Sequence, residues 1–180
     1  MTTPCVAGLG RLGEGNDAMV GVLVLYYSRS GNTKKMAEAV ADGARQAGAE
    51  ARLRNVEEAS VDELAEAGGV ILGSPTYFGH SSGPMRLFLD KSIECHGKLA
   101  GKVGGAFASS ANIGGGNETT ILGILQSMLV HGMVIQGIAQ GDHYGPVSIG
   151  MPDERATRQC KEYGKRLALL VLRLSVQSEQ

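Results

Sequence analysis

Residues 20–33 read VGVLVLYYSRSGNT. The first eight form a short apolar run rich in β-branched and aromatic side chains, which is typical of a strand buried on both faces of a sheet. The next six are polar and lead directly into a helical pattern; they are Ser28, Arg29, Ser30, Gly31, Asn32 and Thr33. This stretch therefore predicts a strand, a tight turn and a helix in immediate succession.

The alternation of strand and helix patterns continues along the rest of the chain. Short apolar or alternating runs predict four further strands, at residues 51–56, 70–73, 102–108 and starting at 133–135. Helical spacing and start signals predict five helices, over 36–47, after the capping box of Ser60 and Glu63, after Pro84, over 117–130 and after Asp153. This order predicts a doubly wound α/β fold, in which ligands bind at the carboxyl ends of parallel strands.

Length and composition favour one domain without a strongly charged partner surface. The chain has 180 residues, of which 43% are hydrophobic, and a formal net charge of −1. This balance indicates neither nucleic-acid binding nor an anionic membrane surface, and no apolar run approaches the roughly 18 residues that span a bilayer. We therefore expect a single soluble domain over residues 19–175, with no nucleic-acid partner and no membrane insertion.

The chain ends and the cysteines indicate a compartment. Residues 1–18 are rich in Gly and lack the apolar run of a secretory signal, so we expect a disordered leader, with Met19 as an alternative start. Residues 176–180 are expected to form a tail. The chain has three widely spaced cysteines and no CxxC pair; they are Cys5, Cys95 and Cys160. This spacing favours reduced thiols in the cytoplasm and argues against an iron–sulfur cluster or a structural zinc site.

The turn at residues 28–33 has the composition of a phosphate-binding loop. The N–H groups at the start of the following helix point at a bound anion, the helix dipole favours negative charge there, and the hydroxyl side chains add donors. Gly31 lets the backbone approach closely. The alternative is that Ser, Asn and Thr only cap the helix. The chain has no GxxxxGK[ST] loop and no GxGxxG after the first strand, which favours a mononucleotide over a dinucleotide.

Two further loops follow the third and fourth strands at the same predicted edge. Residues 73–80 combine Pro75 and Gly79 with the aromatic pair Tyr77 and Phe78, which can stack on a flat aromatic ligand. The alternative is that both rings pack on neighbouring helices. The next loop offers small side chains and bare amides around three successive glycines, which are costly unless the backbone has a special task. For this loop, a plain connector is the alternative.

Residues near the fifth strand are weaker candidates. Four residues there can reach the ligand edge, namely His131, Asp142, His143 and Tyr144, but a lone histidine is usually structural. The alternative for His131 is a helix-end residue that interacts with the last carbonyl groups, and for His143 it is a solvated loop. Cys95 and Cys160 lie in helical segments, where packing is the expected role.

Together these motifs resemble the flavodoxin-like superfamily, most closely the branch that holds WrbA-type NAD(P)H:quinone oxidoreductases and short flavodoxins. The resemblance covers about residues 20–174 and rests on YYSRSGNT (26–33), GSPTYFG (73–79), GGNETTI (115–121), HGM (131–133) and HYG (143–145). It implies a flavodoxin-like three-layer sandwich, with a five-stranded parallel sheet in the order 2-1-3-4-5 and helices on both faces.

The resemblance also implies FMN as the cofactor and assigns its binding residues. The phosphate is expected at Ser28, Ser30, Asn32 and Thr33, with Arg29 and Gly31 in the same turn. The isoalloxazine ring is expected at Pro75, Thr76, Tyr77, Phe78, Gly79, Ser109, Ser110, Asn112 and Gly115, and the last cofactor-binding candidates are His143 and Tyr144. In WrbA-like enzymes the histidine of the His-Gly-Met segment borders the substrate face, so His131 is the expected catalytic residue. No metal is expected.

Several functions remain open at this point. The resemblance implies an enzyme that passes electrons from NAD(P)H through FMN to a quinone. The alternatives are a flavodoxin-type electron carrier for a redox partner protein and a non-catalytic flavin-binding module. A net charge of −1 offers little of the steering that acidic carriers use. WrbA-like proteins carry a tetramer-forming insertion and often a Trp at a neighbouring active site; this chain is compact and has no Trp, so both a homodimer and a tetramer are considered.

Overall fold

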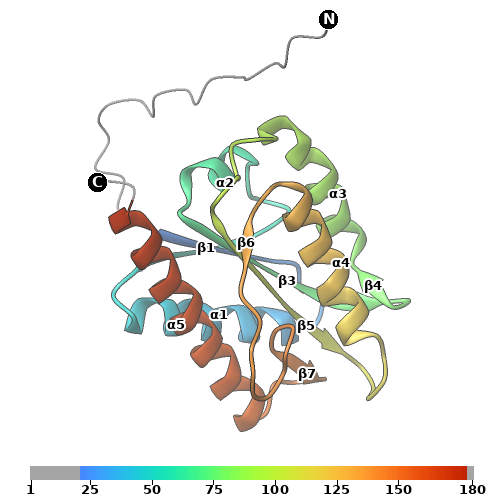
Figure 1. The fold of residues 1–180 in the computed structure, drawn as a ribbon. Coiled ribbons are helices and arrows are strands. Elements are labelled where there is room, and N and C mark those ends of the chain that lie inside the picture. The colour runs from blue at the N-terminus through green and yellow to red at the C-terminus, as the bar shows by residue number, and fades with distance from the viewer. Residues whose placement is uncertain (1–20, 178–180) are drawn as a thin grey trace, which may run out of the picture.

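The computed structural model describes residues 21–177, which form a sheet between two layers of helices (Figure 1). The strands are β1 (Gly21–Tyr26), β2 (Glu50–Asn55), β3 (Gly69–Tyr77), β4 (His80–Ser81), β5 (Val103–Ser110), β6 (Val134–Ile135) and β7 (Val147–Ile149). The helices are α1 (Asn32–Gln46), α2 (Asp62–Glu66), α3 (Gly83–Lys91), α4 (Asn117–Val130) and α5 (Glu154–Gln177), with a short 3-10 helix at Ser92–Cys95.

The ends of the described chain bear on the predicted domain limits. The predicted leader at residues 1–18 lies outside the described residues, and α5 continues to Gln177, past the predicted domain end at residue 175. Asp153 caps α5 as predicted, because its Oδ1 accepts the N–H of Ala156 at 2.7 Å. None of the described helices combines the length and apolar character needed to cross a membrane.

The sheet confirms the predicted strand order. Five strands run parallel in the order β2-β1-β3-β5-β6. Two short strands pair with the same edge of β5 at different points. Val134 of β6 pairs with Val103 at the start of β5, and Val147 of β7 pairs with Ala108 near its end. The sequence predicted only the first piece, since the three residues of β7 are too few to display the two-residue period of a strand.

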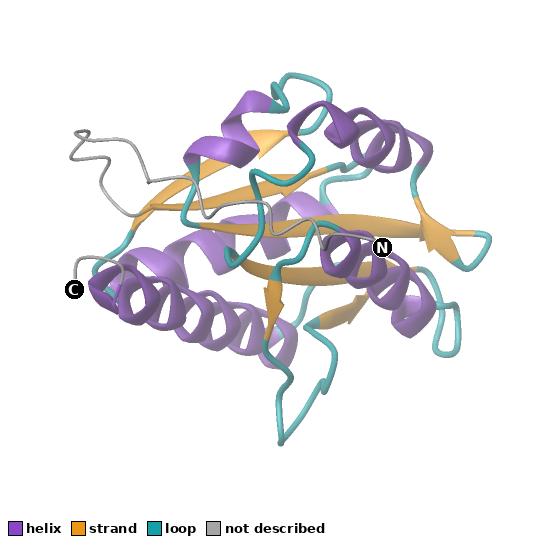
Figure 2. Ribbon diagram, turned by 45° about the horizontal axis from the view of Figure 1, so that its top comes forward, coloured by secondary structure: helices purple, strands orange, loops and turns teal. Residues whose placement is uncertain are grey.

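Helices cover both faces of the sheet and create two apolar cores (Figures 1 and 2). The alternation of β1 sets the division: Val22 and Val24 pack with α1 and α5, while Leu23 and Leu25 pack with α2, α3 and α4. The helices α1 and α5 approach so closely that a Cβ added at Gly43 would lie 1.9 Å from the carbonyl oxygen of Lys161. This contact holds α1, which begins at the polar turn after β1.

Two segments predicted as loops belong to strands. Residues 74–77 continue β3, and Pro75 lies in register with Ser109 of β5. The predicted loop was too long because proline is normally excluded from central strands. The chain instead reverses at Phe78 and Gly79, whose φ angles are 52° and 79°, and enters β4. Likewise Ser109 and Ser110 are the last residues of β5.

Candidate functional site

The polar turn after β1 leaves the first turn of α1 without a side-chain cap. Gly31 has a φ of 89°, and no side-chain hydrogen bond caps the N–H groups that follow it. The Ser28 hydroxyl accepts the N–H of Gly31 at 3.1 Å, which shapes the turn while its own proton can still be donated. The predicted alternative, in which these polar side chains only cap the helix, is therefore not what the structure shows.

The turn fits the phosphate of FMN in its space and its charge. A Cβ at Gly31 would meet no atom within 4 Å, so the backbone there is accessible to a ligand. The first turn of α1 contains no acidic residue but includes Lys34 and Lys35, and Arg29 lies in the preceding turn; all three side chains are exposed. Uncapped N–H groups, the positive end of the helix dipole and nearby cations together suit a doubly charged anion.

Thr33 faces the core and not the open turn. Its side chain is buried, and its Oγ1 lies 2.8 Å from Oγ of Ser109, which is also buried. This hydrogen bond ties the start of α1 to the end of β5. In this geometry the Thr33 hydroxyl joins the turn after β1 to the end of β5, and because either hydroxyl can be the donor, its contact with the phosphate stays a prediction.

The hairpin of β3 and β4 presents both predicted aromatic residues. Phe78 is fully exposed and Tyr77 is 39% exposed, so the alternative in which both rings pack on helices is wrong for Phe78. The hairpin leans on the start of α4, because Thr119 Oγ1 donates to the carbonyl oxygen of Gly79 at 2.6 Å. A Cβ at Gly116 would lie 2.7 Å from the Cα of Gly79, so only glycine permits this contact.

A second polar connection lies beneath the hairpin. Thr120 Oγ1 donates to Thr76 Oγ1 at 3.0 Å, and Thr76 Oγ1 donates to Oδ1 of buried Asn117 at 3.4 Å. Thr76 was predicted from the sequence as a site residue, whereas Asn117 and Thr120 of α4 were not. Asn117 and Thr120 are three residues apart at the start of a helix, so both lie on one face of α4. This spacing is the sequence signal that could have identified them.

The segment between β5 and α4 is a tight turn. Ser110 Oγ donates to the carbonyl oxygen of Asn112 at 2.8 Å, and the same oxygen accepts the N–H of Gly115 at 3.1 Å. Gly116 has a φ of 98° and begins α4 without a side-chain cap. The glycines therefore meet a backbone requirement, and a second uncapped helix start lies beside the hairpin, with N–H groups that suit the carbonyl oxygens of a flavin ring.

His143 and Tyr144 lie in the loop between β6 and β7. His143 Nδ1 is 2.8 Å from the carbonyl oxygen of Ile138, so this nitrogen donates within the loop. Both side chains are exposed, and the loop leads into β7 beside Ser109 and Ser110. The structure thus brings the loop to the edge of β5, while His143 has a role in shaping it.

His131 lies at the opposite end of α4 from the other candidates. It is followed by Val134, which pairs with Val103 at the start of β5, whereas the other candidates gather at the strand ends. Its Nε2 donates to Ser92 Oγ at 2.7 Å, because the Ser92 proton goes to the carbonyl oxygen of Leu89 at 2.6 Å. The structure therefore does not bring His131 to the other predicted flavin residues of its own chain, and its contacts within the chain are those of the helix-end alternative.

The surroundings of His131 favour its neutral form. Its Nδ1 is buried and has no hydrogen-bond partner among the described residues. Burial, and then the nearby His96, whose ring centroid is 5.6 Å away, lower the pKa of His131. Such a histidine stabilises the fold as an uncharged donor to Ser92.

The two described thiols confirm the packing role that the sequence predicted. Cys95 and Cys160 are free and buried, one in each core. Burial raises the pKa of Cys95 and raises the pKa of Cys160 to about 12, so both remain protonated thiols and poor nucleophiles.

The largest of the described hollows is elsewhere. It measures about 630 Å³ and lies between the segment after β2 and α3. Glu57, Asp62 and Glu94 line it, with Lys91 as the one cation among its lining residues. None of the predicted site residues contributes to it, and its carboxylates repel a phosphate. It therefore does not compete with the turn after β1.

Comparisons with known proteins agree with this geometry. The family model for flavodoxin matches residues 24–123, more than half of the chain. A flavodoxin from Aquifex aeolicus is 42% identical over 156 aligned residues, covering 82% of this chain and 84% of that protein. An NAD(P)H dehydrogenase (quinone) from Archaeoglobus fulgidus is 35% identical over 184 residues, covering 83% and 96%. The crystal structure of the flavodoxin, WrbA-like protein from Agrobacterium tumefaciens matches with a TM-score of 0.74 and 28% identity, covering 86% and 98%. This chain belongs to the flavodoxin family.

Proposed function

We propose that this chain is an FMN-dependent NAD(P)H dehydrogenase that reduces quinones. One observation carries the proposal: the carboxyl edge of the sheet combines an uncapped helix start after β1 with two exposed aromatic rings after β3. The first suits a phosphate and the second suits a flat ring, which are the two ends of FMN. The name of the Archaeoglobus fulgidus relative supports the activity.

The phosphate end of FMN is assigned to the turn after β1. Ser28, Ser30 and Asn32 donate side-chain hydrogen bonds, and the backbone N–H groups from Gly31 to Thr33 donate at the helix start. Arg29 adds positive charge without a fixed partner among the described residues. Thr33 contributes through its bond to Ser109, which fixes the distance between the phosphate turn and the ring side.

The ring end is assigned to the hairpin and to the turn after β5. The residues expected there are Pro75, Thr76, Tyr77, Phe78, Gly79, Ser109, Ser110, Asn112, Gly115, His143 and Tyr144. The loop that carries the last two is assigned to the edge of the ring that the substrate approaches. When bound, FMN supplies the transfer of two electrons from NAD(P)H to the quinone, and one further proton from water completes the quinol. The protein holds the reacting rings in place and limits water access.

A flavodoxin-type electron carrier is the second candidate. The alignments with the two curated relatives cover nearly the same share of this chain, yet one runs over 156 residues and the other over 184. The aligned part of the quinone dehydrogenase therefore has positions without a counterpart here, whereas the aligned part of the Aquifex aeolicus flavodoxin is closer in length to this chain. This compactness favours a carrier that delivers electrons to a redox partner protein.

Anaerobic mixing with NADH or NADPH separates the two functions. The chain is loaded with FMN, and the visible absorbance of the flavin is followed after mixing. An enzyme bleaches rapidly and recovers its colour when a quinone is added. A flavin that stays oxidised for many minutes rules out the enzyme and leaves the carrier. Failure to bind FMN at all would overturn both.

We further propose that the protein works in the cytoplasm as a homodimer or tetramer. The two buried free thiols support a reducing compartment, since neither has a disulfide partner. Sedimentation analysis of the FMN-loaded chain measures the assembly, and a monomer at micromolar concentration would contradict this part of the proposal.

A further inference from the structure

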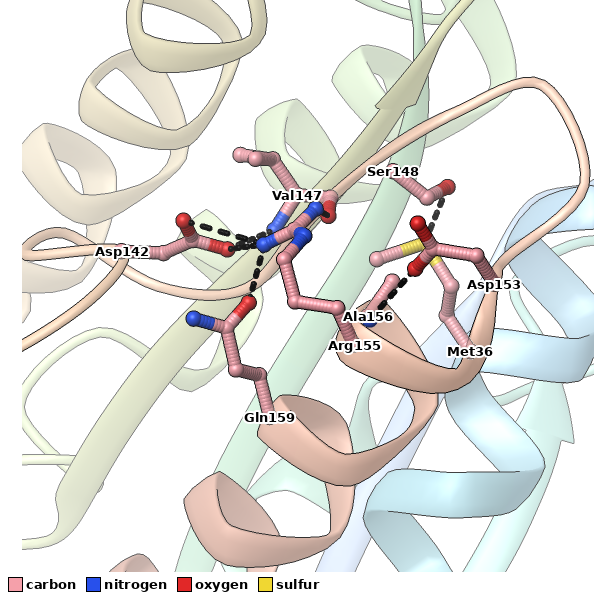
Figure 3. A network of polar contacts seen from close by, with 8 residues as sticks. All are labelled: Met36, Asp142, Val147, Ser148, Asp153, Arg155, Ala156 and Gln159. Atoms are coloured by element: carbon pink, nitrogen blue, oxygen red, sulfur yellow. Dashed lines mark hydrogen bonds and ion pairs between the residues drawn. The ribbon is translucent and has the colours of Figure 1, made fainter.

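The short edge strand β7 is held from its outer side by two charged residues. Asp142 Oδ2 accepts the N–H of Val147 at 2.9 Å, and Arg155 Nη2 donates to the carbonyl oxygen of Val147 at 2.9 Å. Arg155 Nη1 also pairs with Asp142 Oδ2 at 3.1 Å and donates to Gln159 Oε1. Figure 3 shows the guanidinium group between these three partners.

The backbone groups of Val147 need partners that the sheet does not supply. The N–H of Ala108 in β5 donates to the carbonyl oxygen of Pro146, so the residue after Pro146 turns its own N–H and C=O away from β5. In a wider sheet another strand would pair with them. Here the carboxylate of Asp142 and the guanidinium of Arg155 take that place, and they close the sheet edge at Val147.

The loop before β7 is fastened by the same residues. The N–H of Gly145 donates to the carbonyl oxygen of Asp142 at 3.1 Å, and Gly145 lies so close to β5 that a Cβ would be 2.0 Å from the carbonyl oxygen of Ala106. The Asp142 side chain is 19% exposed and that of Arg155 is 43% exposed. This pair is therefore partly sheltered and shares several hydrogen bonds, unlike an isolated surface ion pair.

β7 in turn contacts both parts of the candidate flavin site. Its Ser148 lies in register with Ser109 and donates through Oγ to Sδ of Met36 in α1 at 3.1 Å, as Figure 3 shows. Just after β7, the N–H of Gly150 donates to the carbonyl oxygen of Ser110 at 2.7 Å. A displacement of β7 would therefore reach the serines at the end of β5 and the first turns of α1.

We infer that Asp142 and Arg155 are positioning residues of the flavin site: they hold β7 from its outer edge, and through it the Ser109–Ser110 end of β5 and the loop with Tyr144. This inference rests on the proposed function. The forked guanidinium is essential, because one nitrogen bonds the strand while the other bonds the carboxylate.

Alanine variants of the pair test the inference through FMN affinity and amide exchange. In Arg155→Ala and Asp142→Ala the Kd for FMN is expected to rise about tenfold, and the double variant is expected to add little to either. In the FMN-free protein, the amide of Val147 is expected to exchange at least about tenfold faster in both. Arg158→Ala is the matched control on the same helix, since no hydrogen bond or ion pair of Arg158 occurs among the described residues.

A conservative variant separates positioning from mere stabilisation. Arg155→Lys keeps the charge but offers one ammonium group in place of a fork, so it is expected to restore less than about a third of the lost affinity. In turnover with a quinone, KM is expected to rise more than kcat falls, because the loop with Tyr144 is assigned to the substrate side. If Arg155→Ala does not fold, Arg155→Gln replaces it in the same measurements.

The outcomes distinguish this inference from the proposed function. Lower thermal stability with an unchanged Kd for FMN and an unchanged KM would overturn the positioning role and leave the proposed function intact. A wild-type chain that fails to bind FMN would overturn the proposed function, and with it the positioning of a flavin site. The exchange rate of the Val147 amide would then still show whether Asp142 and Arg155 hold β7.

Discussion

The two ends of α4 differ in how their polar groups find partners. At its start, Gly116 has a φ of 98° and no side chain caps the N–H groups. At its end, the N–H of Gly132 bonds to the carbonyl oxygen of Leu129, and the ring of His131 bonds to Ser92. One helix thus has an open end at the carboxyl edge of the sheet and a closed end at the other. We therefore assign FMN to the end of α4 with uncapped N–H groups and not to the end that carries His131.

The largest expected effect comes from blocking the open end. In Gly116→Val the new Cβ would lie only 2.7 Å from the Cα of Gly79, and valine would be strained at the positive φ of this position. We expect FMN binding to weaken by about 3 kcal/mol, measured by fluorescence titration. Gly123→Ala, on the same helix with open space around it, is the control: it should leave FMN binding unchanged and stabilise the helix by up to about 1 kcal/mol. Equal affinities for both variants would contradict the prediction.

A second prediction concerns the hydrogen bond that joins the start of α1 to the end of β5. Thr33→Val leaves the buried hydroxyl of Ser109 without its partner, so the free energy of unfolding should fall by about 1 to 3 kcal/mol. Urea unfolding of the FMN-free protein measures this. Adding Ser109→Ala should recover part of the loss, because both hydroxyl groups are then absent. Additive losses in the double variant would show that the pair is not coupled.

A smaller effect is expected at the exposed part of the phosphate turn. Ser30→Ala should weaken FMN binding by about 1 kcal/mol and change the free energy of unfolding by less than about 0.5 kcal/mol, since the side chain is exposed. Isothermal titration and urea unfolding measure the two quantities. Ser127→Ala, near the closed end of α4, serves as the matched serine control and should not affect FMN. A loss of stability without a loss of affinity would refute the assignment.

The smallest effect is a pH dependence at the closed end. Because the pKa of His131 is lowered in the fold, the unfolded chain binds more protons below the usual histidine pKa of 6.5. The contribution of His131 to stability is therefore complete above pH 6.5 and is lost as the pH falls through the lower folded value. Urea unfolding between pH 7 and pH 5 should show this decline, and His131→Gln should reduce it with no effect on FMN affinity. An unchanged pH profile in the variant would contradict the interpretation.

The parallel, doubly wound sheet was predicted because complete helical patterns separate the buried strands, whereas the strand order was implied by the resemblance to flavodoxin-like proteins. The sequence also predicted the turns at residues 28–33 and after residue 108, which the structure places at the carboxyl ends of β1 and β5; that these turns bind FMN stays a prediction. It did not predict that β3 extends through Pro75 to Tyr77, because a proline after a strand pattern usually indicates a turn. It did not predict that His131 lies away from the other candidates, because a motif gives neighbours along the chain, and the antiparallel course of α4 carries its end away from the strand ends.

Side-chain contacts across the fold were beyond the reach of sequence patterns. The bond between Thr33 and Ser109 joins residues 76 positions apart, and no local spacing announces it. The same holds for Arg155 and Val147, since the three residues of β7 give no period from which a strand edge can be located. Such contacts depend on register and on which strand lies at the edge, and both are properties of the assembled sheet.

The labelling rates of the two buried thiols would report how often each side of the sheet opens to solvent. Cys95 belongs to the core on the side of α3 and α4, and Cys160 belongs to the core between the sheet and α1 and α5. A thiol reagent can label either one only when its side of the sheet opens. With Cys5 replaced by serine, equal labelling rates would mean that the sheet releases both layers at once. A faster reaction at one cysteine would identify the layer that detaches first.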